Sequence, residues 1–291
     1  VIIGLTSLIP AVLDFEDGQG NSLAFVECSI VSLFFGGCLI IANSHYKREL
    51  NVRQTFLLTV LSWLALSFFS AFPLYFSVIH ISFTDAFFEA VSGVTTTGST
   101  VLSGLDEMPR GVLLWRSIIQ WIGGIGIIAF AIVILPFLRI GGMQLFQTES
   151  SDRSDKIVPK TTDIVRCIIF VYIVLTALCA LTYYFLGMNS FDAINHALTT
   201  IPTGGYSTHD ASFGYFDSAA LQYAASFFML TGGLPFVLFV NFFFYGKNDF
   251  KKDEQVRFII PAILLLIAVF TLWLWTHTGF LFSDSLRYSV F

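Results

Sequence analysis

Long apolar stretches alternate with short charged loops along most of the chain. A helix needs about 20 predominantly apolar residues to cross about 30 Å of hydrocarbon. Six stretches approach or exceed that length and together hold a single Asp, Glu, Lys or Arg, which is Glu27. They are residues 22–43, 56–79, 117–138, 167–191, 218–246 and 258–276. Residues 1–13 read as the tail of a seventh span. The pattern predicts an all-α integral membrane protein.

The composition agrees with this pattern and excludes several classes of protein. Of the 291 residues, 55% are hydrophobic and 12% are charged, with a mean hydropathy of +0.77. A soluble domain has about a quarter charged residues. The four cysteines lie in predicted spans without metal-ligand spacing, which favours a packing role. The spans also lack the paired ionisable groups of an intramembrane catalytic site, so we do not expect an enzyme.

Basic residues concentrate in three alternate loops. Twelve of the 15 Lys and Arg residues lie within residues 44–54, 139–166 and 247–257. Because cytoplasmic loops carry an excess of Lys and Arg, these loops are expected in the cytoplasm. That orientation places the N-terminus in the cytoplasm and the final residues outside.

The loops on the opposite side carry mainly acidic residues. These are Asp14, Glu16, Asp17, Asp106, Glu107, Asp210 and Asp217. An acidic outer face would concentrate cations near a pore mouth. Ordinary solvated loop charges are the alternative, and the sequence leaves both interpretations open.

Two segments repeat one pattern. Residues 82–100 read SFTDAFFEAVSGVTTTGST, and residues 189–208 read NSFDAINHALTTIPTGGYST. Each lies between two uncharged spans, and each runs from an Asp-Ala pair to a Thr/Gly stretch. The distance from the Asp to a glycine of that stretch is 13 residues in both copies, from Asp85 to Gly98 and from Asp192 to Gly205. A third copy begins at residues 282–291, with Asp284 in the equivalent place.

Neither segment is long enough to cross a membrane. The apolar part of the first, residues 86–94, would rise about 14 Å as a helix, less than half of the hydrocarbon core. The spans on either side need their ends on the same face. A re-entrant helix that returns as extended backbone meets both demands. Such backbone is tolerated at membrane depth only where it is buried in protein or lines a wet cavity.

The Thr/Gly stretches suit a dehydrated cation. Extended backbone can aim a column of carbonyl oxygens at an ion, glycine permits positive φ, and Thr hydroxyls supply further oxygen atoms. Asp85 and Asp192 are expected to cap the short helices, whose partially negative C-terminal ends would face the pore. Polar turns between helices are the alternative, but two copies at matched spacing favour a selectivity filter.

Three strings resemble the TrkH/KtrB/HKT superfamily of potassium transporters, and the TrkH family most closely. They are TDAFFEAVSGVTTTGSTVLSGLDEMPR at 84–110, QWIGGIGIIAFAIVILPFLRIGGMQLF at 120–146 and FDAINHALTTIPTGGYSTHDASFGYFDS at 191–218. The resemblance covers nearly the whole chain. It implies four helix–pore loop–helix units, similar to those of potassium channels, around a central pore, with two transmembrane helices in front.

On this scheme the chain divides into four parts. They are 1–50 with the two leading helices, 51–145 as the first unit, 146–250 as the second unit, and 251–291 as the start of a third. A closed filter needs four contributions, so the chain is expected to be part of a longer protein and not to conduct alone.

The resemblance also assigns the filter residues. The first strand is Thr95, Thr96, Thr97 and Gly98, and the second follows Pro202 as Thr203, Gly204 and Gly205. Gly98 and Gly205 match the selectivity glycines, and Gly98 fits the potassium-permeant pattern. K⁺ is expected at Thr96, Thr97, Thr203 and Gly204. Gly204 departs from the first strand, which has Thr97 there, so one hydroxyl is lost.

Residues around the filter are expected to support it. Asp85, Glu89, Asp192 and Arg116 are the candidates for pore-helix support. Arg116, at the outer start of a span, is expected to pair with Glu89 or another outer acid, with snorkelling to the headgroups as the alternative. Two glycine clusters within spans favour close helix packing over a bend near the pore. They are Gly123, Gly124 and Gly126, and Gly232, Gly233 and Pro235.

These observations predict transmembrane potassium uptake, with K⁺ as the transported ion and no cofactor. A sodium- or proton-coupled secondary cation transporter is the alternative, and it would need an alternating-access site at broken helices. The resemblance implies a homodimer in the lipid of a bacterial inner membrane, and no nucleic acid. It also implies a cytosolic nucleotide-binding partner similar to TrkA or KtrA. The basic loops 139–166 and 247–257 are its candidate docking surfaces.

Overall fold

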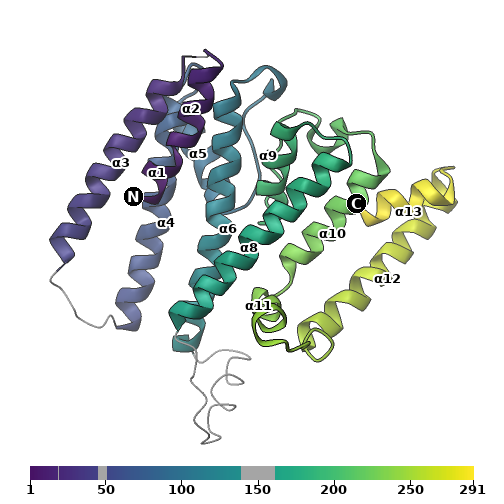
Figure 1. Ribbon diagram of the computed structural model, residues 1–291. Helices are drawn as coiled ribbons and strands as arrows, with labels where there is room; N and C mark the ends of the chain where they lie inside the picture. Colours follow the sequence, from purple (N-terminus) through teal and green to yellow (C-terminus); the bar gives the residue numbers. More distant parts are fainter. Residues whose placement is uncertain (19, 45–50, 139–160) are drawn as a thin grey trace, which may run out of the picture. The chain divides into compact units, whose positions relative to one another are not determined.

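Helices make up all the secondary structure in the described part of the chain (Figure 1). The computed structural model describes residues 1–18, 20–44, 51–138 and 161–291. Its α-helices are α1 (Ile2–Thr6), α2 (Leu8–Glu16), α3 (Ser22–Asn43), α4 (Val52–Tyr75), α5 (Phe83–Val94), α6 (Arg110–Leu138), α8 (Thr161–Phe185), α9 (Ser190–Thr200), α10 (Ala219–Gly233), α11 (Phe236–Tyr245), α12 (Glu254–His277) and α13 (Phe282–Val290). Two short 3₁₀ helices, η1 (Leu105–Glu107) and η3 (Ser212–Tyr215), lie in the loops.

Five described helices are long and apolar enough to cross a membrane. They are α3, most of α4, the first part of α6, most of α8, and α12. The predicted span 218–246 is instead two helices, α10 and α11, whose axes differ by 88°. The break falls at Gly233–Pro235, where proline lacks the N–H that would continue the helix. Residues 1–13 lie in the short helices α1 and α2, which are not among the five, so the expected tail of a span there stays a prediction.

The described helices belong to two compact units. The first comprises residues 1–158 together with 204–212, and the second comprises 159–203 together with 213–291. The loop 204–212, which follows α9 in the chain, therefore packs with the first unit. The four-part division stays a prediction. Residues 45–50 and 139–160, which hold parts of two basic loops, lie outside the described residues.

In the first unit the short helix α5 packs against both α4 and α6. α2 lies against α3 and α6, and α3 lies against α4. Trp115 of α6 is fully buried at the centre of this packing. Its ring meets Phe25 of α3 edge-on at a centroid distance of 6.1 Å. Its indole N–H donates to the Ser70 carbonyl of α4 over 2.9 Å, which satisfies the polar atom of a buried aromatic residue.

In the second unit α9 packs against α8 and α10, α11 packs against α8, and α13 packs against α12 and α10. The buried Tyr183 of α8 shares a 3.0 Å hydrogen bond with Thr200 at the end of α9. The ring of Tyr183 also contacts Phe213 and Phe228.

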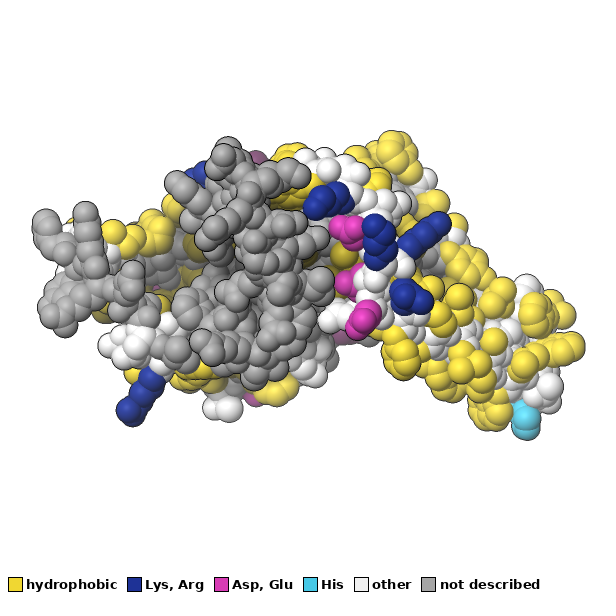
Figure 2. Space-filling view, turned by 90° about the horizontal axis from the view of Figure 1, so that it is seen from below, with side chains coloured by type: hydrophobic (Ala, Val, Ile, Leu, Met, Phe, Trp, Pro, Cys, Tyr) yellow, Lys and Arg dark blue, Asp and Glu magenta, His cyan; other side chains and the backbone are white. Residues whose placement is uncertain are grey.

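Viewed from below, Lys, Arg, Asp and Glu side chains gather beside the α11–α12 loop, and the neighbouring surface along α12 is hydrophobic (Figure 2).

Both units show the same close packing behind their short helices. A side chain on Gly123 of α6 would overlap the carbonyl of Val94 at the end of α5. A side chain on Gly232 of α10 would overlap the carbonyl of Ile201, directly after α9. Close packing is therefore confirmed for these two glycines. The 88° bend follows Gly233, so the second cluster serves both packing and bending.

The expected caps of the short helices are wrong in detail. Ser82 caps α5, and its hydroxyl accepts from the Asp85 N–H and donates to the Asp85 carboxylate. Asn189 caps α9 in the same way through Asp192. Both aspartates occupy the third helical position, since the cap must precede the first helical residue. There they bond back to the cap and lie favourably at the positive end of the helix.

Of the seven outer acidic residues, Asp14 is buried and the other six are exposed. Asp14 is fully buried at the end of α2, and its Oδ1 accepts from the Gly111 N–H in the first turn of α6 over 2.7 Å. Asp17 pairs with Arg110 over 3.2 Å. These two carboxylates therefore tie α2 to the start of α6. The buried position of Asp14 rules it out as a solvated loop charge.

Candidate functional site

The first Thr/Gly segment, residues 95–98, is tied to the end of α5 by its own backbone. The Thr96 N–H donates to the Gly93 carbonyl over 2.9 Å, and the Thr97 N–H donates to the Ser92 carbonyl over 2.8 Å. The Ser92 hydroxyl donates to the carbonyl of Ser99 over 2.6 Å. These bonds satisfy helix-end carbonyls that would otherwise lack partners, so the segment leaves α5 in a defined direction.

The second segment, residues 202–205, has the same backbone conformation. Thr96 and Thr203 both have a φ of 56°, and the glycines two residues later, Gly98 and Gly205, have φ values of 79° and 80°. The Thr203 N–H donates to the Thr200 carbonyl over 2.9 Å, as Thr96 does to Gly93. Positive φ is uncommon for threonine and costs about 1–3 kcal/mol. Its occurrence at both matched positions indicates a shared functional constraint.

Gly98 and Gly204 approach each other closely within the first unit. A Cβ atom on Gly98 would overlap the Gly204 carbonyl oxygen, and one on Gly204 would overlap the Gln120 side chain. At Gly205 a Cβ would meet no described atom within 4 Å. Glycine is thus required by space and by backbone conformation at Gly98, by space at Gly204, and by conformation alone at Gly205.

A buried ion pair lies behind the first segment. The Arg116 Nε donates to Glu89 Oε1 over 2.7 Å, and the two side chains are 1% and 0% exposed. The same carboxylate accepts from the Thr100 hydroxyl and from the Val101 N–H. The expected pairing of Arg116 with Glu89 is confirmed, and it connects α5, α6 and the backbone that follows the first Thr/Gly segment.

The loop after the second segment joins this cluster. The Arg116 Nη1 donates to the Ser207 carbonyl over 3.0 Å, and its guanidinium lies 4.3 Å from the centroid of the Tyr206 ring. The Tyr206 hydroxyl donates to the Glu89 carbonyl over 2.7 Å. The Tyr206 N–H donates to Gln120 Oε1 over 3.1 Å. The side chains of Arg116, Tyr206 and Gln120 thus hold residues 204–207 against α5 and α6.

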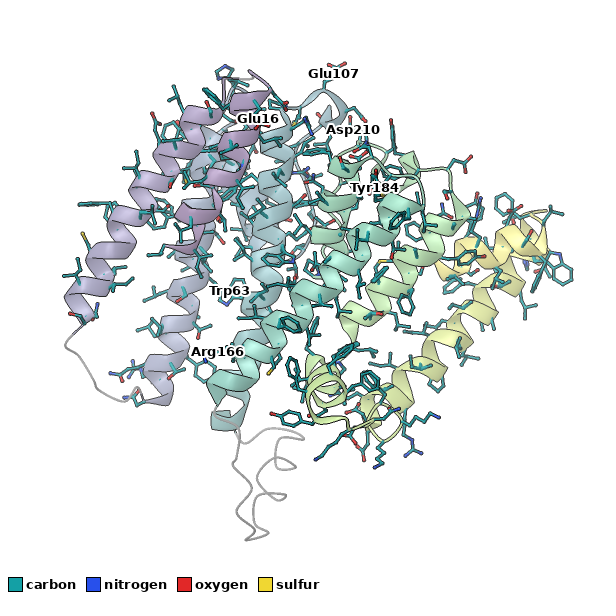
Figure 3. The ribbon with its side chains drawn as sticks, viewed as in Figure 1. Glu16, Trp63, Glu107, Arg166, Tyr184 and Asp210 are labelled. Carbon is teal, nitrogen blue, oxygen red and sulfur yellow. The ribbon has the colours of Figure 1, made fainter. Side chains whose placement is uncertain are left out.

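The outer loops that follow the two segments are joined to each other. The Asp210 carboxylate accepts from the backbone N–H groups of Gly104 and Leu105 over 3.0 and 3.1 Å. In return, Asp106 accepts from the Asp210 N–H over 3.2 Å, and its Oδ1 lies 2.5 Å from His209 Nδ1. Asp210 lies just below the η1 loop that carries Glu107 (Figure 3). The hydrogen bond to His209, and then that to the Asp210 N–H, lower the pKa of Asp106.

The structure brings together most of the residues that the sequence singled out. The first unit contains Thr95, Thr96, Thr97, Gly98, Gly204, Gly205, Asp85, Glu89 and Arg116. Thr203 and Asp192 belong to the second unit. Sequence reasoning missed Gln120 and Tyr206. Gln120 carried a signal, because it is an isolated amide near the start of an uncharged span, and polar groups inside a membrane are expensive.

A family model decides the classification. The model of the TrkH family, described as a cation transport protein, matches residues 21–286.

The chain belongs to the TrkH family.

Relatives of similar sequence are named for potassium uptake. The chain is 40% identical to the Trk system potassium uptake protein TrkI of Halomonas elongata, over 94% of this chain and 56% of that protein. It is 40% identical to the Trk system potassium uptake protein TrkH of Escherichia coli, over 95% of this chain and 57% of that protein. The chain thus spans somewhat over half the length of these TrkH-family relatives.

A solved structure of a TrkH-family protein has the same fold. The crystal structure of the potassium transporter TrkH from Vibrio parahaemolyticus superposes with a TM-score of 0.90 at 36% identity. The match covers 99% of this chain and 60% of that one. Together with the apolar helices, this places the chain among multi-pass membrane proteins whose relatives are named as transporters.

Proposed function

We propose that this TrkH-family chain forms part of a potassium uptake protein, and that its two Thr/Gly segments are two of the strands of a selectivity filter. The observation that carries the proposal is the repeated backbone conformation, with positive φ at Thr96 and Gly98 and again at Thr203 and Gly205. Alternating signs of φ turn successive carbonyl oxygens toward one side, whereas a regular β-strand alternates them. A row of carbonyl oxygens on one side can replace the water around K⁺.

Side-chain exposure supports the same assignment. Thr95, Thr97, Thr203 and Gly205 are exposed, while α5 and α9, which hold the segments, are largely buried. The Thr95 and Thr97 hydroxyls share a 2.8 Å hydrogen bond. The segments therefore present oxygen atoms to an open space and are anchored from behind, which is the arrangement a cation path needs.

The proposed site of uptake is the bacterial inner membrane. The basic loops 44–54, 139–166 and 247–257 would face the cytoplasm together with the N-terminus, and the joined loops around Asp106 and Asp210 would lie outside. A homodimer and a cytosolic nucleotide-binding partner similar to TrkA or KtrA complete the proposal. The exposed charges of 247–257 are its candidate docking surface within the described residues. Reversing the charges of Lys251 and Lys252 should abolish co-purification of that partner, and unchanged co-purification would contradict the docking surface.

Rubidium uptake by the full-length protein in proteoliposomes tests the filter, with sodium as competitor. Gly205→Ser is the sharper variant, because the added atoms meet open space and act through the backbone and the new hydroxyl. Gly98→Ser also forces the Gly204 carbonyl aside. Gly279→Ser is the matched control, since Gly279 has a φ of 72° and open space but lies outside the Thr/Gly segments.

We expect wild-type uptake to discriminate against sodium, both filter variants to lose that discrimination, and Gly279→Ser to keep it. Discrimination that survives in Gly205→Ser and Gly98→Ser would show that these segments are not the filter.

A coupled secondary transporter is the second candidate, and the 88° break between α10 and α11 favours it. Coupled transporters bind their substrates at discontinuous helices. Uptake that stops when the proton and sodium gradients are both collapsed, while a potassium gradient remains, would support coupling. Uptake that follows the potassium gradient and the membrane potential alone would support the channel-like path.

A further inference from the structure

Gln120 is a buried amide within an apolar helix. It lies in the membrane-crossing part of α6 and is fully buried. A buried amide group is unfavourable unless its oxygen and nitrogen are hydrogen-bonded. The side-chain carbons of Gln120 fill the place that a side chain on Gly204 would take. Gln120 therefore lies directly behind the second Thr/Gly segment, and its polar end needs an explanation.

The orientation of the amide follows from its one hydrogen bond. Its Oε1 accepts from the Tyr206 N–H over 3.1 Å. Reversing the amide would set two N–H donors against each other, so the oxygen must face Tyr206. Its Nε2 then points away, and no described atom accepts a hydrogen bond from it. Nε2 lies 3.6 Å from the position of a Cβ on Gly98, so the donor faces the place where the two segments meet.

One turn earlier on α6, Arg116 holds the next stretch of the same loop. It donates to the Ser207 carbonyl, and its guanidinium covers the Tyr206 ring. Residues four apart lie on one face of a helix. This face of α6 therefore contacts residues 204–207 through two side chains one turn apart. Arg116 acts through Glu89 on the first segment as well, whereas Gln120 bonds directly to the Tyr206 N–H and lies against Gly204.

We infer that Gln120 is a positioning residue that sets the spacing between the two Thr/Gly segments, and through it the discrimination between K⁺ and Na⁺. This inference rests on the proposed function. Selectivity in a carbonyl filter depends on the size of the ion cavity or on the number and strength of its carbonyl dipoles. Both depend on where the Gly204 carbonyl lies relative to Gly98. The Tyr206 N–H bond pulls the second segment toward α6, and the side-chain carbons limit its approach.

The second unit suggests the variant that separates positioning from packing. Gly123 and Gly232 make equivalent contacts, and three residues before them stand Gln120 and Met229. Gln120→Met therefore keeps an unbranched side chain of similar length, and the equivalent position of the second unit already holds methionine. The variant removes the oxygen that accepts from the Tyr206 N–H. Gln120→Glu keeps that oxygen. Ser117→Ala is the control, because the buried Ser117 hydroxyl bonds within its own helix to Leu113.

The experiment compares these full-length variants in proteoliposomes by the sodium concentration that halves rubidium uptake, with uptake normalised to folded protein. One hydrogen bond contributes about 0.5–1.5 kcal/mol net, which corresponds to a change of about 2- to 12-fold. We therefore expect Gln120→Met to lose about 3- to 10-fold of the discrimination, Gln120→Glu to stay within about twofold of wild type, and Ser117→Ala to match wild type.

Discrimination unchanged in Gln120→Met would overturn the inference and leave Gln120 as a packing residue. An equal loss in Gln120→Met and Gln120→Glu would also overturn it. If Gln120→Met does not fold, Gln120→Asn, which draws the amide back by one methylene, should show the same loss. A Gly205→Ser variant that keeps its discrimination refutes the proposed function itself. A Gly205→Ser variant that loses it beside an unaffected Gln120→Met refutes only the role of Gln120.

Discussion

Glu89 and Arg116 show how one buried pair can connect two parts of a chain that are distant in sequence. Both are almost fully excluded from solvent. Each finds enough hydrogen-bond partners to offset the loss of water, since Glu89 also accepts from Thr100 and Val101, and Arg116 also donates to Thr100 and Ser207. At the scale of residues, Glu89 and Arg116 therefore form a hydrogen-bonded polar pair inside an apolar protein.

Removing one member of this pair should be strongly destabilising. Glu89→Ala leaves the Arg116 charge buried without its carboxylate, which costs about 3–5 kcal/mol. The melting temperature in detergent should be much lower for Glu89→Ala than for wild type. The double variant Glu89→Leu with Arg116→Met should recover part of the loss, because it leaves neither charge behind. A single variant as stable as wild type would mean that water reaches the pair.

At the scale of elements, glycine positions decide how closely the long and short helices approach. Gly232 and Gly233 are neighbours at the end of α10, but only Gly232 faces a backbone carbonyl, that of Ile201. Gly232→Ala should lower the free energy of unfolding by about 1–3 kcal/mol through overpacking. Gly233→Ala meets open space and should be neutral or slightly stabilising. Equal effects of the two changes on thermal unfolding would contradict this packing.

The start of α6 depends on a carboxylate from another element. Asp14 of α2 accepts from the Gly111 N–H and so supplies a cap that α6 does not carry itself. Asp14→Ala should lower stability by about 0.5–2 kcal/mol, the usual effect of losing a cap. Asp14→Asn keeps the acceptor oxygen and should lose less. Thermal unfolding of both variants checks the order, and an Asp14→Asn variant less stable than Asp14→Ala would refute the capping role.

At the scale of the whole molecule, the joined outer loops predict a dependence on pH. The pKa of Asp106 lies below its ordinary value of 3.8 because of its hydrogen bonds to His209 and Asp210. A carboxyl group with a lowered pKa contributes stability above the ordinary value, and that stability is lost as the pH falls through the lowered value. The melting temperature of wild type should therefore exceed that of Asp106→Asn most clearly near neutral pH. This difference should shrink as the pH falls below about 3.8.

Glu107→Gln is the control for this prediction. It removes one carboxylate from the same exposed loop but leaves the acceptor for His209 in place. The same pH dependence in Asp106→Asn and Glu107→Gln would mean that general loop charge is responsible, and not the Asp106–His209 contact.

The amino-acid sequence by itself determined the spans, the repeat and the Thr/Gly segments. These features depend on the length of apolar runs and on spacing within 20 residues or so, and both are local. The pairing of Glu89 with Arg116 could also be predicted from the sequence, because few charges lie near the membrane-crossing stretches. The correct helix caps could also have been found in the sequence. Ser82 and Asn189 stand three residues before Asp85 and Asp192 and have the side chains that cap helices.

Only the tertiary structure decided how the two Thr/Gly segments are held. The loop 204–212 packs with the first unit although it follows α9 of the second. The Tyr206–Gln120 bond joins residues 86 positions apart, and the Asp210–Gly104 bond joins residues 106 apart. No periodicity in the sequence encodes such contacts, because they arise when several helices pack together and bring unrelated backbone groups within 3 Å or so of a side chain. The buried role of Asp14 has the same origin, because the Gly111 N–H that it accepts from lies 97 positions away.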